Sequence, residues 1–285
     1  MAKTHDLKRR IRSIKNTMQV TKAMKMVSAA RLRRAQDRIL AARPFAVMTG
    51  RVLASLAARA NPELHPLLVQ REIKRVELVL VTSDRGLCGS FNANAIKVAT
   101  GFLAQHAGAA QNVMTVGRRG RDFVRRRRLK ITAEWIDVFR NLEFSTARLI
   151  GDDLIDRYTR GEVDAVYVAY NEFKNVVSQR PVVEQILPIP RAELLGAGGG
   201  EDYIYEPEPE SLFESILPGY VRIQVWRSLL ESAAAEHAAR MTAMDSATKN
   251  AKELTEALTL HMNRVRQASI TTAIIEVVSG AAALE

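Results

Sequence analysis

The 285-residue sequence contains a single cysteine, Cys88, and only five scattered histidines. One thiol excludes an intramolecular disulfide framework and a four-cysteine metal site. The histidines show no metal-ligand spacing such as His-Glu-x-x-His, which argues against a zinc enzyme. No apolar run approaches the roughly 18 residues that span a bilayer, and the N-terminus lacks the apolar core of a secretory signal. These absences predict a protein that is soluble where it is made.

Acidic residues are nearly absent from the first 50 residues. That segment has thirteen Lys and Arg against only Asp6 and Asp37, so it holds the entire net charge of +11. The remaining 235 residues are neutral as a group. We therefore expect one end of the molecule to meet an acidic partner. The alternative interpretation is a basic coiled-coil protein that binds nucleic acid.

Proline and glycine are scarce at the start of the chain. No proline precedes Pro44 and no glycine precedes Gly50, and Ala, Arg, Lys, Met and Leu dominate. This composition predicts one long helix over residues 1–60. Its apolar residues at positions 7, 11, 14 and 18 form a heptad-like seam. The seam is expected to continue less strictly through Met24, Val27 and Leu32.

The last 75 residues show the same scarcity, which predicts a second long helix over residues 211–285. Two long helices at opposite ends of the chain pair most economically as an antiparallel coiled coil, with the C-terminal helix overhanging its partner. The expected seam of the second helix alternates steps of three and four through Met241, Met244, Thr248, Ala251, Thr255, Leu258, Met262, Val265 and Ser269.

The overhanging segment, residues 270–284, contains one charged residue, Glu276, and is apolar or small on every side. A helix that is apolar all round has to be buried, yet no partner remains within the chain to cover it. The segment is either a frayed tail or an insertion into another protein.

Between the helices, the hydrophobic period changes from that of helices to that of strands. The alternation predicts a small α/β domain over residues 61–210 with a mainly parallel sheet. Pro188 places the last strand at an edge, because proline cannot donate to a ladder. We expect a linker at residues 61–72 and a loop at residues 196–214. The expected strands are residues 76–82, 113–117, 165–171 and 182–189, and the expected helices are residues 93–105, 121–129 and 144–160.

Two segments of this domain could carry chemistry. Residues 83–92 form a strand-to-helix turn with two glycines, but they match neither G-x-G-x-x-G nor a P-loop, which favours a tight turn with a helix cap over a nucleotide site. Cys88 has no histidine nearby in sequence to act as its base. Arginines at positions 118–128 form a basic cluster with only Phe123 interleaved, so the stacking platform of a single-strand binder is missing.

Three ordered blocks stand out along the chain: Asn16-Thr17-x-x-Val20-Thr21-Lys22-Ala23-Met24-x-Met26-Val27, Ser83-Asp84-Arg85-Gly86-Leu87-Cys88-Gly89, and Arg266-Gln267-Ala268-Ser269-Ile270-Thr271 followed by Glu276-Val277-Val278-Ser279-Gly280-Ala281-Ala282-Ala283. Together they resemble the γ subunit of the rotary ATP synthase, and the resemblance covers the whole chain. Two positions depart from the family pattern: Ala273 and Lys25 stand where an acidic residue is usual. The paired-cysteine insert of the chloroplast form is absent.

The resemblance implies an α/β fold class in which a long antiparallel coiled coil of terminal helices, residues 1–60 and 211–285, carries an inserted Rossmann-like α/β domain, residues 61–210. It implies that the chain is the central rotor shaft of the F1 sector. This shaft couples proton flow through the membrane ring to ATP synthesis or hydrolysis at the β subunits. The implied partners are the α and β subunits of the α3β3 hexamer, the ε subunit and the ring of c subunits. No catalytic residue, cofactor, metal, nucleic acid or small-molecule substrate is expected.

The resemblance also implies a set of contact residues. Arg266, Gln267 and Thr271 match the family's polar contacts to a β loop, and Met24 matches a shaft position near the β lever. The tip with Ile274 and Val278 is expected in a hydrophobic bearing. From the charge pattern, we add Arg33 and Arg34 as contacts to acidic β loops. Because no transit peptide is apparent, the cytoplasmic face of a bacterial plasma membrane is the expected location.

Overall fold

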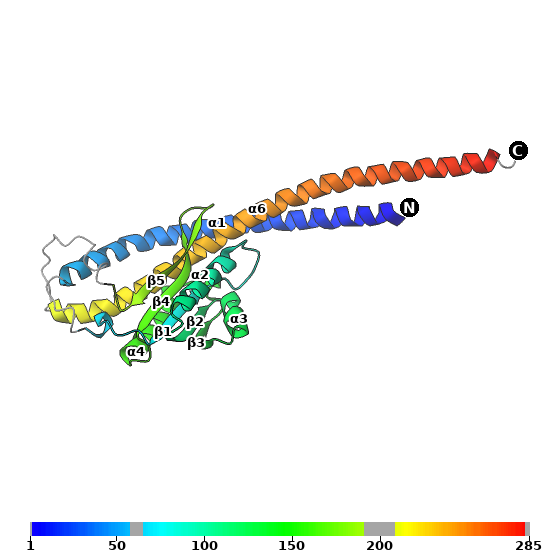
Figure 1. Ribbon diagram of the computed structural model, residues 1–285. Coiled ribbons are helices and arrows are strands. Elements are labelled where there is room, and N and C mark those ends of the chain that lie inside the picture. Colours follow the sequence, from blue (N-terminus) through cyan, green and yellow to red (C-terminus); the bar gives the residue numbers. More distant parts are fainter. Residues whose placement is uncertain (1, 58–64, 191–208, 283–285) are drawn as a thin grey trace. The chain divides into compact units, whose positions relative to one another are not determined.

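The computed structural model describes residues 2–57, 65–190 and 209–282 (Figure 1). The chain divides into two compact units, one made of Met1–Ser28 with Met241–Glu285 and the other of Ala29–Arg240. The boundaries expected at residues 60 and 210 stay predictions. Residues 61–64 of the expected linker and residues 196–208 of the expected loop lie outside the described residues.

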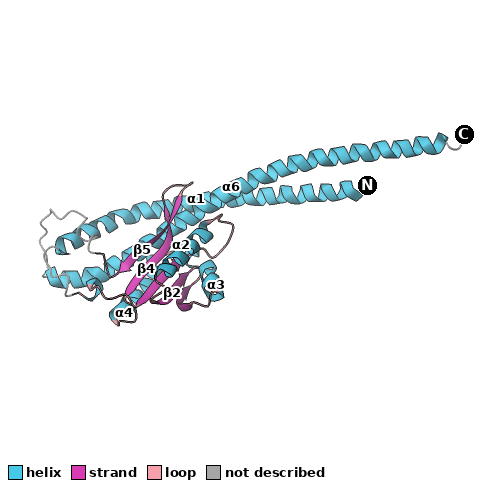
Figure 2. Cartoon of the chain, in the orientation of Figure 1, coloured by secondary structure: helices cyan, strands magenta, loops and turns pink. Residues whose placement is uncertain are grey.

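Two long helices stand at the ends of the chain, as the sequence predicts (Figure 2). Helix α1 is Ala2–Ala57 and helix α6 is Pro209–Ala282, and each contains one internal proline, Pro44 and Pro218. The loop expected over residues 196–214 is wrong for its last six residues, because α6 begins at Pro209. Proline is favoured in the first turn of a helix, where its missing N–H would have no partner.

The first unit is an antiparallel coiled coil. Thr21 Oγ1 and Thr248 Oγ1 are hydrogen-bonded at 2.8 Å, and Lys25 Nζ lies 2.5 Å from Asp245 Oδ1. Moving forward along α1 from Thr21 to Lys25 thus corresponds to moving backward along α6. In Figure 1, the N-terminal part of α1 runs beside α6. The predicted antiparallel pairing is confirmed.

The coiled-coil seam follows the predicted positions on α6, where all nine are buried or half-buried. On α1, the expectation for Val27 is wrong, because its side chain is 53% exposed. Thr21 and Ser28 occupy the seam instead. A small hydroxyl side chain can be buried in a seam when it forms a hydrogen bond with the backbone of its own helix. Thr21 Oγ1, for example, donates to the carbonyl oxygen of Met18 at 3.0 Å.

The second unit contains a five-stranded sheet in the order β3-β2-β1-β4-β5. Strands β1 to β4 pair in parallel, and β5 pairs antiparallel with β4 at the edge. This confirms the predicted mainly parallel sheet and the edge position of the last strand. The strands are β1 (Arg75–Val81), β2 (Ala110–Val116), β3 (Lys130–Trp135), β4 (Ala165–Phe173) and β5 (Gln179–Leu187).

The sequence did not reveal strand β3. Its residues, KITAEW, are mostly half-buried at the edge of the sheet, so a continuous apolar run is absent. The helix expected to reach residue 129 ends at Arg126, and Arg128 with φ 56° turns the chain into β3. Edge strands lose the hydrophobic pattern that identifies central strands, because one side faces solvent.

Both faces of the sheet are covered by helices. Val76, Leu78 and Leu80 pack with buried side chains of α2 (Phe91–Gln105) and α3 (Arg118–Arg126). Val79 and Val81 pack in the cluster that includes side chains of α4 (Phe144–Thr159) and α6. A strand buried on both faces is apolar at nearly every position, which explains the RVELVLV run of β1.

Glu77 is the exception within β1, since its carboxyl group is fully buried. The hydroxyl of Thr132 donates a short hydrogen bond to Glu77 Oε1, whereas Oε2 has no hydrogen-bond partner. Burial disfavours the carboxylate and raises the pKa of Glu77 to about 7, despite the opposing charge of Arg157. The sheet therefore contains an acid that titrates near neutral pH.

Candidate subunit-binding site

The C-terminal end of α6 exposes an apolar surface, which we call the tip and define as residues 270–279. Ile274 is 57% exposed and Val278 is 61% exposed. Ala2 lies nineteen residues before Thr21, so antiparallel pairing with α1 runs out near residue 267 of α6. The overhang predicted from the sequence is confirmed, and nothing in the described part of the chain covers it.

Four predicted contact residues of α6 share one face of the helix. Gln267, Thr271, Ile274 and Val278 are spaced by four, three and four, the spacing of one helical stripe. All four are exposed, and the hydroxyl of Thr271 donates to the carbonyl oxygen of Gln267 at 3.0 Å. Arg266 is exposed beside this stripe and forms no ion pair with any described residue. The stripe joins polar contacts to the apolar tip in one surface.

Met24 lies on α1 in the same unit and is half-buried. Its neighbour Lys25, which stands where the family usually has an acidic residue, is paired with Asp245. Hydrogen bonds from Lys25 and Lys249 lower the pKa of Asp245, so this carboxylate stays ionised over a wide pH range. The departure at Lys25 therefore supports the coiled coil, which the sequence alone did not indicate.

Arg33 and Arg34 belong to the other unit, and both are exposed. Neither forms a hydrogen bond or ion pair through its side chain with the described residues. The contact of Arg33 and Arg34 with acidic loops of β stays a prediction.

The glycine-containing turn after β1 is built by internal hydrogen bonds. The side chain of Asn92 accepts from the backbone N–H of Ser83 at 3.0 Å and donates to Cys88 Sγ at 3.2 Å. Cys88 is buried against Phe91 of α2 and Ala235 of α6. Leu87 and Gly89 adopt positive φ, which closes the turn tightly. The tight turn predicted from the sequence is confirmed, whereas Ser90, the residue before α2, forms no side-chain capping hydrogen bond.

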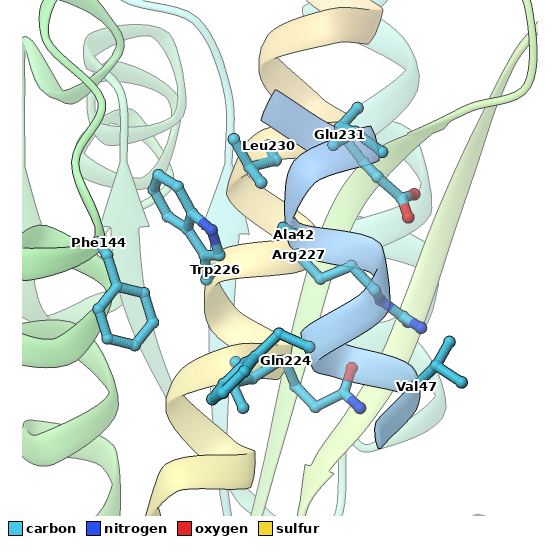
Figure 3. A pocket seen from close by; sticks show the side chains of 11 residues that line it. Ala42, Val47, Phe144, Gln224, Trp226, Arg227, Leu230 and Glu231 are labelled. Carbon is cyan, nitrogen blue, oxygen red and sulfur yellow. The ribbon is translucent and has the colours of Figure 1, made fainter. Parts of the chain in front are cut away.

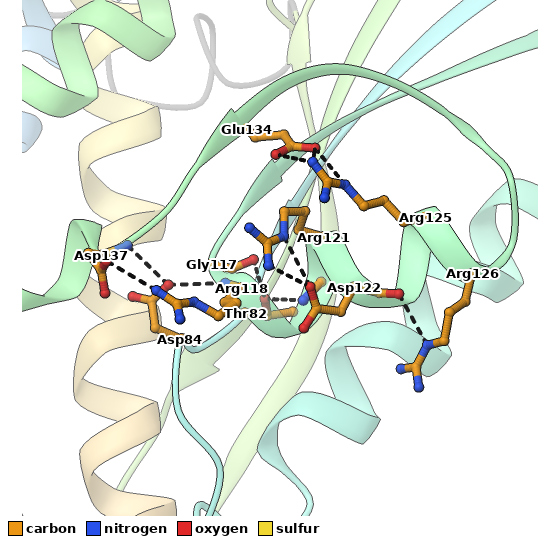
Figure 4. A network of polar contacts seen from close by, with 11 residues as sticks. Thr82, Asp84, Gly117, Arg118, Arg121, Asp122, Arg125, Arg126, Glu134 and Asp137 are labelled. Carbon is orange, nitrogen blue, oxygen red and sulfur yellow. Dashed lines mark hydrogen bonds and ion pairs between the residues drawn. The ribbon is translucent and has the colours of Figure 1, made fainter.

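Carboxylates partner several arginines of the basic cluster at α3 (Figure 4). Arg125 contacts Glu134 at 2.8 Å, Arg121 contacts Asp122 at 2.7 Å and Arg118 contacts Asp137 at 3.3 Å. Gly117, with φ 98°, immediately precedes α3, and a Cβ atom there would lie 2.0 Å from the carbonyl oxygen of Thr82. The cluster thus joins α3 to the edge strand β3, and carboxylates neutralise the three arginines named here.

An apolar groove of about 570 Å³ lies between α1, α4 and α6 in the second unit (Figure 3). The ring of Phe144 meets Trp226 edge-on, with 5.9 Å between centroids. The charged side chains of Arg227 and Glu231 also line the groove, and Glu231 Oε2 is buried without a hydrogen-bond partner. Apolar walls with a few polar groups are typical of binding sites. The sequence did not indicate this groove.

Within the described ranges, no helix is long and apolar enough to cross a membrane. The same residues contain no group of three or more His, Cys, Asp or Glu side chains arranged to hold a metal ion.

These features define a class of protein: a two-helix coiled coil with an exposed apolar end and an α/β domain between its helices. The family model described as "ATP synthase" matches residues 3–284. The ATP synthase gamma chain of Anaeromyxobacter sp. (strain Fw109-5) is 50% identical, over 100% of both chains. That of Solibacter usitatus is 51% identical, over 98% of both chains. The chain belongs to the ATP synthase gamma-chain family and has the function of a central-stalk subunit.

Solved structures agree with this assignment. A chain of the central stalk and c-ring of the Tetrahymena thermophila mitochondrial ATP synthase is 31% identical, with a TM-score of 0.62 over 80% of this chain and 99% of that chain. A chain from the Euglena gracilis mitochondrial ATP synthase is 17% identical, with a TM-score of 0.71 over 99% of this chain and 95% of that chain, and it supports the fold alone.

Proposed function

We propose that this chain is the rotating shaft of an F-type ATP synthase, placed inside an α3β3 hexamer and coupled to a membrane ring of c subunits. The observation that carries the proposal is the tip, an apolar helix end that extends beyond its partner helix and exposes Ile274 and Val278. Apolar side chains at this density gain free energy when another protein covers them. A sleeve formed by the α and β subunits supplies that cover.

The shaft acts by contact and carries out no bond chemistry of its own. An asymmetric coiled coil presents a different face to each of three β subunits, so each β site experiences different contacts at any moment. Gln267, Thr271 and Arg266 supply polar contacts to one β loop, while Met24 lies near the β lever. The ε subunit and the c-ring bind the α/β domain outside the hexamer. The location that follows is the cytoplasmic face of a bacterial plasma membrane.

We expect the isolated chain to have no ATPase activity, because the turn at residues 83–92 is closed by its own hydrogen bonds and lacks a phosphate-binding lysine. Mixing the chain with purified α and β subunits should give cooperative ATP hydrolysis. A coupled-enzyme ATPase assay of each subunit alone and of the mixture makes the comparison. Hydrolysis by the chain alone, at a rate unchanged after further purification, contradicts the shaft proposal.

Reversing both charges, Arg33→Glu and Arg34→Glu, should weaken coupling between hydrolysis and proton pumping. Exposed charges contribute only about 0 to 1 kcal/mol each to stability, so the chain should remain folded. Proton pumping into membrane vesicles, measured per ATP hydrolysed, gives the result. The matched control is Arg148→Glu on α4 with Arg160→Glu just after it, which makes the same change of charge elsewhere. Equal coupling in both double variants contradicts a role for Arg33 and Arg34.

A further inference from the structure

A second cavity of the α/β unit is surrounded by arginine. Arg31, Arg34 and Arg38 of α1 and Arg140 at the end of the 3₁₀ helix Val138–Arg140 line a pocket of about 170 Å³. The four residues are exposed, so the pocket opens to solvent. No acidic residue lines it. Four like charges around one cavity repel one another unless an anion joins them.

The arginines of the pocket are not neutralised within the described part of the chain. Arg31, Arg34 and Arg140 form no ion pair there, in contrast to the paired arginines of α3. Arg38 donates to the backbone carbonyl of Leu142 at 3.0 Å, which fixes its guanidinium but leaves its charge unbalanced. A guanidinium presents several N–H donors in a plane, a geometry suited to the oxygens of phosphate.

His237 of α6 lines the same pocket, and its side chain carries the second observation. The residue is only 8% exposed, and its ring nitrogen Nδ1 is buried without a hydrogen-bond partner. Buried polar groups are nearly always paired, so the unpaired Nδ1 atom of a side chain in the wall of a cationic cavity is consistent with an anion bound there. Around it lie Arg31 and Arg34 of α1, and Arg240 of α6, which is paired with Glu236 at 2.6 Å.

We propose that this pocket binds a phosphate-like oxyanion, held by Arg31, Arg34, Arg38 and Arg140 with His237 at its inner wall. All five residues belong to one unit of this chain. Burial and the nearby arginines lower the pKa of His237 to about 4 in the free protein. A bound anion opposes those positive charges, so the imidazole takes up a proton more readily when the site is filled.

The test is calorimetric titration of the full chain with inorganic phosphate, against sodium chloride at matched ionic strength to remove general screening. One molecule of phosphate should bind per chain. The double variant Arg31→Gln with Arg140→Gln should lose at least tenfold in affinity. The matched control Arg51→Gln, an exposed arginine of α1 outside the pocket, should retain full affinity. Circular dichroism verifies that each variant is folded. The single variant Arg140→Lys retains the positive charge, so it separates an effect of lost charge from an effect of misfolding.

A second measurement follows the histidine. The NMR signal of the His237 ring, assigned by its loss in His237→Gln, should shift when phosphate is added. Sulfate, which does not titrate between pH 5 and 8, should bind more tightly as the pH falls. Equal binding by the double variant and the control, or no change in the His237 signal, overturns the site. Binding of an acidic peptide without binding of phosphate also overturns it, and assigns the arginines to protein docking. None of these outcomes depends on assembly into a rotary complex.

Discussion

Replacing Ile274 and Val278 with Asp is expected to weaken assembly of the chain with α and β subunits at least a hundredfold while leaving the free chain folded. Both side chains are more than half exposed in the free chain, so the charges cost little there. In a sleeve that excludes water, each unpaired charge costs several kcal/mol, and about 1.4 kcal/mol corresponds to a tenfold change in affinity. Size-exclusion chromatography of the mixed subunits, over a range of concentrations, measures the loss.

The matched control introduces two Asp residues at exposed apolar positions of the other unit, Ile73 and Val177, which are 43% and 85% exposed. This variant should assemble normally with α and β. Hydrogen exchange adds a direct measurement: amides of residues 270–279 should exchange quickly in the free chain and slowly in the complex. Fast exchange in both states would mean that the tip is a frayed tail, and the bearing would have to be abandoned.

Stability of the chain should fall as the pH rises from about 4.5 to about 7, and the variant Glu77→Gln should lack this dependence. The folded-state pKa of Glu77 is about 7, above the ordinary value of 4.5, so the folded chain binds the extra proton across this window. The contribution of this proton to the free energy of unfolding is fully present below the unfolded-state pKa. It is lost as the pH rises through the folded-state pKa. A difference of this size corresponds to about 3 kcal/mol at pH 8.

Urea denaturation of the full chain, followed from pH 4 to pH 8, measures the effect. Glutamine retains an oxygen that can accept from Thr132, as the protonated acid does, and it adds no charge. At pH 8, Glu77→Gln should therefore be more stable than the original chain. Glu253→Gln, at an exposed position of α6, is the control and should keep the original pH dependence. An unchanged pH dependence in Glu77→Gln would mean that the sheet tolerates the carboxylate without cost.

The sequence predicted the helices and the central strands because their patterns are long or strongly apolar. The nine seam positions of α6 repeat regularly enough to identify every one, and β1 is apolar because helices cover both of its faces. Strand β3 was missed because its residues are half-buried or exposed and none is fully buried. On α1, Val27 was preferred to Ser28 for its apolar side chain, although in a helix the small Ser28 can be buried once its hydroxyl is satisfied locally.

Surfaces formed by distant segments could not be predicted in the same way. The tip was identified because a continuous apolar segment of the C-terminal helix extends beyond the end of its partner helix. In contrast, the arginine pocket combines residues 31–38 with Arg140 and His237, and only the fold brings these three segments together. The raised pKa of Glu77 likewise results from burial in the folded sheet, and the hydrogen bond from Thr132, on the strand that was missed, opposes the rise. Charge and hydropathy patterns identify contiguous surfaces, whereas convergent side chains require the structure.

The polar pairs of the coiled coil set the alignment of its two helices. Thr21 with Thr248, and Lys25 with Asp245, both match in only one axial position. If α1 slid along α6 by one turn, about 5.4 Å, both pairs would separate and the buried threonine hydroxyls would face apolar side chains. These pairs add little to stability, since Lys25 and Asp245 are partly solvated, but they oppose axial slip. A shaft that transmits torque needs such position-specific pairs, because helices joined only by apolar contacts can slide along each other when torque is applied.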